Sequence, residues 1–224
     1  MIHGLTFKEY VAEEKEKFSE MTKEEKISYF KEYYLKLCIF AFICLIFLLW
    51  FLTDMILSFR HTISTGGVIG AEISEEGTNY LTEDYMKYLD KSKVFNKIDF
   101  APNVYFDKSD SQTVMALQAE LATNTYNYLI STETGLDFVA DTECLADLNE
   151  VLDDEMKNIL ADKIVYKKIG ESGEEIAAAI DITDTAFTKE YISAGEKVYY
   201  IITGKSNDYE SGLNVLKYLL QKTS

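Results

Sequence analysis

The chain carries one long block of apolar residues, set between segments in which apolar and polar positions alternate. Apolar residues run unbroken from Leu37 to Leu52, and the apolar character continues to Phe59 before Arg60. At ~1.5 Å rise per residue, a helix over this block spans about the ~30 Å of a bilayer's hydrocarbon core. The pattern predicts a transmembrane helix over residues 37–59, preceded by a tail over 1–36 and followed by a linker over 60–66 and a domain over 67–224.

The tail has the signals of two helices. Thr6 is followed three residues later by Glu9, and Thr22 by Glu25, which is the spacing of a capping box at a helix start. We therefore expect two helices in residues 1–36, the second of which continues into the span.

Beyond the linker, short strand-like runs alternate with helical ones. The expected strands are 68–73, 98–106, 126–130, 164–167, 175–182 and 197–203, and the expected helices are 113–122, 136–140, 155–161, 185–192 and 207–221. In the longer helices, the apolar residues that fall on one face are Val114, Leu117 and Leu121 in the first, and Leu213, Leu216, Leu219 and Leu220 in the last. This alternation predicts the α/β class, with a sheet covered by helices.

The distribution of basic residues predicts the orientation of the span, because positive residues are retained on the cytoplasmic side. The lysines that closely precede the span are Lys23, Lys26, Lys31 and Lys36. After Arg60, the only basic residue before Lys87 is His61. The expected location is thus the cell membrane, with a cytoplasmic N-terminus and an extracellular C-terminal domain. A cleaved signal peptide is the alternative, but its apolar region is usually ~7–15 residues, so an uncleaved signal-anchor is favoured.

The net charge of the C-terminal domain limits the classes of partner that we expect it to bind. From His61 onward the chain has 29 Asp plus Glu against 14 Lys, a formal balance of −15. A field of that sign repels nucleic acid and anionic lipid headgroups, so we expect neither as a partner of this domain. The partners that remain are the membrane through the single span, and a small solute or an envelope protein through the domain.

Cysteine and histidine usage excludes several chemistries. Cys144 is the only thiol after the span, so the domain forms no internal disulfide, and its apolar neighbourhood predicts a buried side chain. No histidine follows His61, which removes Ser-His-Asp and Cys-His catalysis and the usual zinc sites. We therefore expect no metal, no cofactor and no enzymatic activity. An envelope enzyme that acts through carboxylates is the alternative, since acidic clusters occur at residues 107–110, 153–155 and 181–184.

Several segments in order resemble a known family. Ser111-Gln112-Thr113 leads into an amphipathic helix, the strand Tyr128-Leu129-Ile130 follows, and then come Cys144–Leu148 and the terminal helix with Val215–Leu220. This order resembles the extracytoplasmic solute-binding proteins of the periplasmic-binding type II class, in the reduced form found in single-pass membrane proteins of Gram-positive bacteria. The resemblance implies a degenerate solute-binding lobe behind a membrane anchor.

Together these observations predict a membrane-anchored extracytoplasmic binding or interaction module whose ligand the sequence does not identify. A concave pocket with convergent polar groups would favour a solute, and a flat apolar patch would favour a protein partner. Because α/β sheets place ligands at the carboxyl ends of their strands, Tyr126, Tyr128 and Thr142 are the candidate ligand-binding residues.

Overall fold

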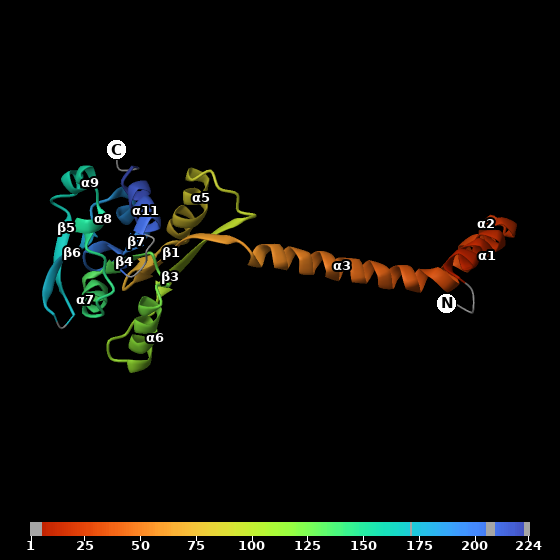
Figure 1. Ribbon diagram of the computed structural model, residues 1–224, viewed down its shortest axis with the longest axis horizontal. Coiled ribbons are helices and arrows are strands. Elements are labelled where there is room, and N and C mark those ends of the chain that lie inside the picture. The colour runs from red at the N-terminus through yellow and green to blue at the C-terminus, as the bar shows by residue number, and fades with distance from the viewer. Residues whose placement is uncertain (1–5, 171, 205–208, 222–224) are drawn as a thin grey trace. The chain divides into compact units, whose positions relative to one another are not determined.

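The computed structural model describes residues 6–170, 172–204 and 209–221, and its ribbon is drawn in Figure 1. The chain forms two compact units, Met1–Phe59 and Arg60–Ser224. The first unit is helical and the second is a mixed α/β domain.

The N-terminal unit contains the helices that the sequence predicts. They are α1 (Phe7–Glu20), α2 (Lys23–Tyr29), a π-helical segment η1 (Phe30–Tyr34) and α3 (Leu35–Ser58). Both capping boxes are present, since the backbone N–H of Thr6 and that of Thr22 each donate to the glutamate three residues on at 2.8 Å. The second helix continues through η1 into α3, as expected.

The continuous helix over Lys23–Ser58 is the one helix, within the described part of the chain, that is long and apolar enough to cross a membrane. None of the side chains of α3 is buried in the protein. The helix is therefore compatible with a membrane anchor by length and composition, although a signal sequence near an N-terminus has the same properties.

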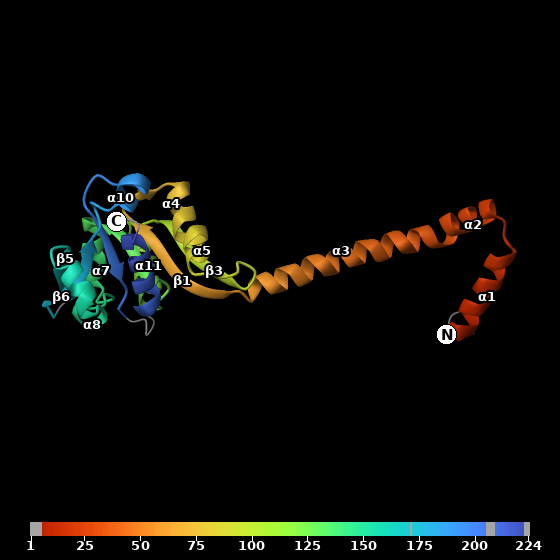
Figure 2. The same ribbon diagram turned by 90° about the horizontal axis from the view of Figure 1, so that it is seen from above.

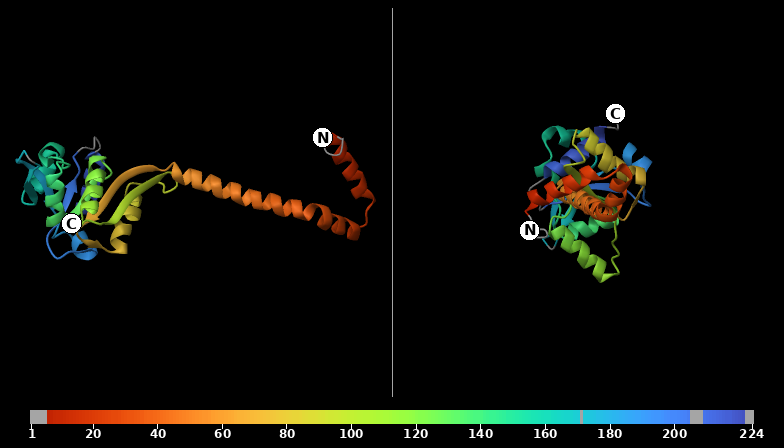
Figure 3. Two further views of the ribbon diagram at one scale, coloured as in Figure 1. Left: turned by 90° about the horizontal axis from the view of Figure 1, so that it is seen from below. Right: turned by 90° about the vertical axis from the view of Figure 1, so that its right-hand side faces the viewer.

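A six-stranded mixed sheet forms the centre of the second unit, in the order β3-β1-β4-β8-β6-β5. Strands β3, β1 and β4 are parallel, and each pairing from β4 to β5 is antiparallel. β1 and β3 lie side by side over most of their length (Figure 3). The strand bounds are β1 (His61–Ile69), β3 (Asn96–Val104), β4 (Tyr128–Thr132), β5 (Ile164–Ile169), β6 (Glu174–Asp181) and β8 (Val198–Ile202), and a separate ribbon pairs β2 (Glu72–Ile73) with β7 (Ile192–Ser193).

Helices cover both faces of this sheet, as the sequence predicts (Figures 1 and 2). Their bounds are α4 (Glu75–Asn79), π-helical η2 (Tyr80–Asp84), α5 (Tyr85–Tyr88), α6 (Ser111–Ala122), α7 (Glu133–Asp141), α8 (Leu148–Val151), α9 (Asp154–Ile159), α10 (Ala186–Tyr191) and α11 (Tyr209–Gln221). Alternate strand residues face opposite ways, so Tyr128 joins the core under η2, α5 and α11, whereas Leu129 joins the core under α6 and α7.

The predicted helix faces are confirmed. Leu117 and Leu121 of α6 are buried on one side of the sheet, and Leu216 and Leu219 of α11 on the other. The first two positions of the expected helix 207–221 lie outside the described residues. Cys144 is buried in the core shared with α7, as predicted, and it is a free cysteine.

The expected linker over 60–66 is wrong, because β1 begins at His61. Gly66 and Gly67 stand inside this strand, and their lack of a side chain leaves room for neighbouring rings. A Cβ atom on Gly66 would lie 2.2 Å from Cζ of Tyr128. Only Phe59 and Arg60 therefore separate the end of α3 from the first strand of the domain.

Strand order reverses beside β1. From β1 the chain passes through η2 and α5 to β3 on one side, and then through α6 on the opposite face to β4 on the other side. The point where connections diverge to opposite faces leaves a crevice at the carboxyl ends of the strands, which is where α/β sheets hold ligands.

Candidate functional site

A crevice of about 480 Å³ opens at the carboxyl ends of the three parallel strands. Each strand contributes its last residue or the residues directly after it, and Glu196 in the loop before β8 lines one side. The lining residues are Gly70 after β1, Tyr105, Phe106, Asp107 and Lys108 after β3, Thr132, Thr134 and Gly135 at the β4–α7 junction, and Glu196. The volume suits a small molecule.

Gly70 keeps the β1 side of the crevice open. Its φ of 73° lies in the left-handed region that favours glycine. A Cβ atom at this position would lie 2.5 Å from Oγ1 of Thr132. Glycine is therefore required both by the backbone conformation and by the close approach of Thr132.

Thr132 supplies an unpaired polar group. It is 1% exposed, and its Oγ1 has no hydrogen-bond partner among the described residues. Thr132 precedes α7 at the N-cap position, yet its side chain does not cap the helix. Because a buried hydroxyl without a partner costs ~1–3 kcal/mol, a ligand that bonds to it would recover that energy.

The first turn of α7 approaches the sheet closely beside this hydroxyl. A Cβ atom on Gly135 would lie 2.2 Å from Oγ of Ser131 and 2.8 Å from Cγ2 of Ile69, so only glycine permits this packing. The first N–H groups of a helix lack intrahelical acceptors, and the helix dipole favours negative charge there. This wall of the crevice therefore suits an acceptor or anionic group.

The β3 side carries a different set of groups. Tyr105 is exposed, and Phe106 packs on Phe138 with ring centroids 4.4 Å apart. Asp107 accepts hydrogen bonds from the backbone N–H and hydroxyl of Ser109, at 2.8 and 2.7 Å, and these bonds lower the pKa of Asp107. An ionised Asp107 and the exposed Glu196 make this rim suited to a cationic group, with Lys108 as the nearby positive charge.

A charged network holds α7 in place next to the crevice. Nζ of Lys167 on β5 donates to Glu133 and, at 2.8 Å, to Asp137, while the hydroxyl of Tyr199 on β8 also donates to Glu133. The bond from Lys167, followed by that from Tyr199, lowers the pKa of Glu133. Burial lowers the pKa of Lys167, but its hydrogen bonds to Asp137 and Glu133 raise the pKa by more, so the net pKa is raised. Glu133 is thus a structural contact of the helix start.

Tyr126 and Tyr128 do not lie at the carboxyl end of β4, where a ligand-binding role would place them. β4 begins at Tyr128, so both residues are at the amino end of the strand and far along it from Thr132. The hydroxyl of Tyr126 donates to Glu120 at 2.7 Å, and Tyr128 is fully buried on the opposite face of the sheet. The expected strand 126–130 starts and ends two residues before β4, and Tyr126 was its first residue and Tyr128 its middle one.

Thr142 is also outside the crevice. It follows α7 at the helix C-cap, where its hydroxyl donates to the carbonyl of Val139 at 2.7 Å. The structure therefore does not bring the three candidates together. The sequence did contain a signal for the crevice. The run Thr132-Glu133-Thr134-Gly135, at the end of a buried strand, is a strand-to-helix junction with two hydroxyls and a glycine.

The acidic clusters of the sequence have local structural roles. Asp110 caps α6, Asp153 caps α9, and Asp181 bonds Thr183 and Lys197. Across residues 6–170, 172–204 and 209–221, no group of three His, Cys, Asp or Glu side chains is placed to hold a metal ion.

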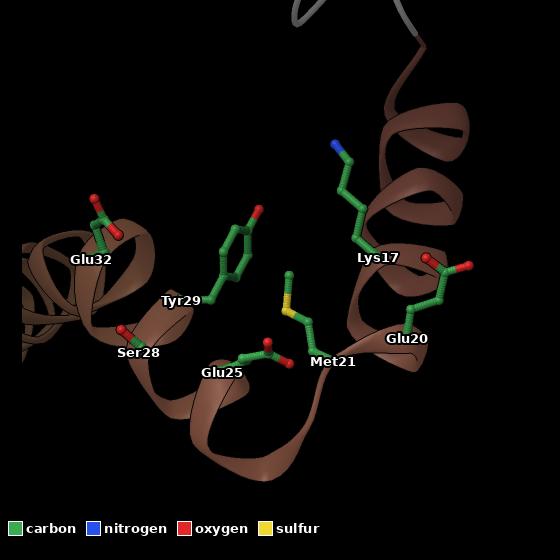
Figure 4. Close-up of a pocket in the computed structure, with 7 residues that line it drawn as sticks. All are labelled: Lys17, Glu20, Met21, Glu25, Ser28, Tyr29 and Glu32. Atoms are coloured by element: carbon green, nitrogen blue, oxygen red, sulfur yellow. The ribbon is translucent and has the colours of Figure 1, made fainter.

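A second concavity of about 530 Å³ lies within the N-terminal unit, between α1 and α2 (Figure 4). Met21 and Tyr29 stand in the angle between the helices, and the other lining residues are Lys17, Glu20, Glu25, Ser28 and Glu32. Hydroxyls of Tyr29 and Tyr34 donate to Glu14 at 3.0 and 2.6 Å and tie the two helices together. Glu25 already accepts the hydrogen bond of the capping box. The side chains of this concavity therefore serve the packing of α1 against α2.

The comparisons with known proteins found no relative of this chain. No protein-family model, curated protein or solved structure matches the chain. The resemblance to solute-binding proteins therefore stays a prediction, and the function is inferred from the crevice and the apolar helix.

Proposed function

We propose that this protein is a single-pass membrane-anchored binding module that holds a small polar solute in the crevice at the carboxyl ends of β1, β3 and β4. It acts as a binder rather than a catalyst. The observation that carries the proposal is the buried, unpartnered hydroxyl of Thr132 in a crevice of about 480 Å³ where strand order reverses.

The anchor in this proposal is α3. Its length matches a bilayer core. The lysines before it and their scarcity after it support a cytoplasmic location for residues 1–36 and an outside location for the α/β domain. An uncleaved helix keeps the domain at the membrane surface, where a captured solute stays next to the cell.

The chemistry of the crevice favours a solute with two opposite ends. The first turn of α7 and the Thr132 hydroxyl suit a carboxylate or other acceptor, whereas Asp107 and Glu196 suit an ammonium group. Phe106 and Tyr105 add an apolar wall. A zwitterion such as a free amino acid or short peptide meets all three requirements, which agrees with the solute-binding lobe that the sequence resembles.

A thermal-shift screen of the full chain in nanodiscs tests the proposal. The panel contains amino acids, short peptides, sugars and divalent cations. A ligand at 100 times its dissociation constant adds about 2.7 kcal/mol to stability, which raises the melting temperature by several degrees. We expect an amino acid or peptide to give this shift.

Two threonine variants locate the effect. Thr132→Val removes the buried hydroxyl with little change in shape and should abolish the shift. Thr142→Val changes a threonine outside the crevice and should retain the shift. The absence of a shift across the panel would contradict the solute assignment and favour a module that contacts an envelope protein.

A further inference from the structure

We propose that the loop Lys91–Phe95 of the α/β domain rests in the interfacial layer of the bilayer that holds α3, and so gives the domain a second membrane contact. This inference rests on the anchor in the proposed function but not on the solute. Its basis is an exposed apolar pair, its tether to the start of β1, and the cations around it.

The loop presents apolar side chains on a fixed turn. Val94 is 50% exposed and Phe95 is 68% exposed. Ser92 holds the turn, since its carbonyl accepts from the backbone N–H and side-chain amide of Asn96 at 3.1 and 2.9 Å, and its hydroxyl accepts from the N–H of Val94 at 3.3 Å. These bonds keep polar groups inside the turn and leave Val94 and Phe95 pointing outward.

Covalent connection places this loop close to the end of the span. The backbone N–H of His61 donates to the carbonyl of Phe95 at 2.8 Å. His61 is two residues after Phe59, the C-cap of α3, and two extended residues reach at most ~7 Å. The Phe95 carbonyl therefore stays within about 10 Å of the end of the helix, whatever direction the helix takes.

Cations lie near this apolar pair and neutralise the carboxylates of this part of the acidic domain. Four of its 14 lysines fall within residues 87–97, and three of them form ion pairs at 2.8 Å: Lys87 with Asp84, Lys93 with Glu83 and Lys97 with Asp99. A pocket of about 170 Å³ beside the loop is lined by Arg60, Lys93 and Lys97 together with Glu83. Nε of Arg60 is buried and has no hydrogen-bond partner among the described residues.

An apolar tip flanked by cations fits the boundary between headgroups and acyl chains. Rings such as Phe95 insert at that depth, while lysine and arginine reach the phosphates. The formal balance of −15 describes the whole domain, so it predicts repulsion of anionic headgroups on average. Around this loop, Arg60 and the four lysines offset Glu83, Asp84, Asp90 and Asp99, so the local charge is close to neutral.

Lipid quenching of tryptophan fluorescence tests the inference on the full chain. The native chain has one tryptophan, Trp50, so each variant also carries Trp50→Phe. Phe95→Trp reports on the loop and Tyr105→Trp is the matched control. Phe95 and Tyr105 flank β3 at its two ends, about 30 Å apart at ~3.3 Å per residue, and are 68% and 66% exposed. Both variants are reconstituted in liposomes with phospholipids brominated near the top of the acyl chain.

We expect the brominated lipids to reduce the emission of Phe95→Trp at least two-fold and to leave that of Tyr105→Trp unchanged. Carbonate extraction first shows whether the chain stays with the liposomes. If it stays, and brominated lipids leave the emission of both variants equal and acrylamide quenches both equally, the inference is overturned. Release of the chain by carbonate overturns the anchor itself, and with it this inference, so the two failures are distinguished.

Discussion

Two stacked tyrosines in the core allow one prediction to be worked through. Tyr128 on β4 and Tyr200 on β8 are both fully buried, and their rings are 5.4 Å apart and nearly parallel. The hydroxyl of Tyr200 donates to the carbonyl of Gly212 at 2.7 Å, whereas the hydroxyl of Tyr128 has no partner among the described residues. The same substitution, tyrosine to phenylalanine, should therefore have opposite effects at these two positions.

The expected magnitudes follow from the hydrogen bonds. A net intramolecular hydrogen bond contributes ~0.5–1.5 kcal/mol, so Tyr200→Phe should lower the free energy of unfolding by about 1 kcal/mol. Removal of a buried hydroxyl that lacks a partner relieves a cost of ~1–3 kcal/mol, so Tyr128→Phe should raise it by about 1 kcal/mol or more. Each change deletes one oxygen atom and leaves the ring in place, so neither opens a large cavity.

Urea unfolding of both variants, followed by circular dichroism, measures this difference. We expect the two midpoints to move to opposite sides of the wild-type midpoint, with a gap of roughly 2 kcal/mol, equivalent to ~4–8 °C in melting temperature. Equal destabilisation by both substitutions would show that the Tyr128 hydroxyl is bonded, and the contrast between the two tyrosines would then be wrong.

Two further predictions concern the crevice and its support. Gly70→Ala should destabilise the domain by about 1–2 kcal/mol, because φ is 73° and the added Cβ would lie 2.5 Å from Oγ1 of Thr132. Gly195→Ala is the control in the same urea experiment, because a Cβ there meets nothing within 4 Å. Equal stability of the two variants would contradict the claim that position 70 requires glycine. The lowered pKa of Glu133 means that its ionised form stabilises the fold fully above the unfolded pKa of about 4.5, and that this contribution is lost as pH falls through the lower folded value. Glu133→Gln should therefore lose less stability than wild type between pH 7 and pH 3, and an identical loss in both would show that the contact with Lys167 does not stabilise the ionised carboxylate.

Elements with a strong local pattern were predicted correctly from the sequence. The capping boxes at Thr6 and Thr22, the apolar block of α3, and the buried faces of α6 and α11 each follow from residues within one turn or one helix. Such signals depend on neighbours in sequence, so these elements can be predicted without knowledge of the fold.

The segment η2–α5 was missed for a different reason. Its apolar residues Tyr80, Leu81 and Tyr85 face the core, and Ser74 caps the preceding helix, so a helical signal was present. Gly77 within α4 is unfavourable for a helix by local propensity. The glycine is required there because a Cβ would lie 2.6 Å from Tyr191, a residue more than a hundred positions away.

The crevice depends on strand order, which local patterns do not give. Thr132 and Gly70 are far apart in sequence and meet because β1 and β4 are parallel neighbours, with Ile69 paired to Ser131. The two tyrosine candidates lie at the amino end of β4, because neither of them was the last residue of the expected strand 126–130 and that strand was set two residues too early.

Glycine-selective ¹⁵N labelling of the full chain in bicelles offers a decisive test of the binding site. The chain has 11 glycines, of which Gly70 and Gly135 line the crevice, while Gly173 lies in the β5–β6 turn and Gly212 in α11. On titration with a mixture of the protein amino acids, we expect the amide signals of Gly70 and Gly135 to move and those of Gly173 and Gly212 to stay. Shifts confined to glycines outside the crevice, or no shift at any glycine, would contradict a solute site at the carboxyl ends of β1 and β4.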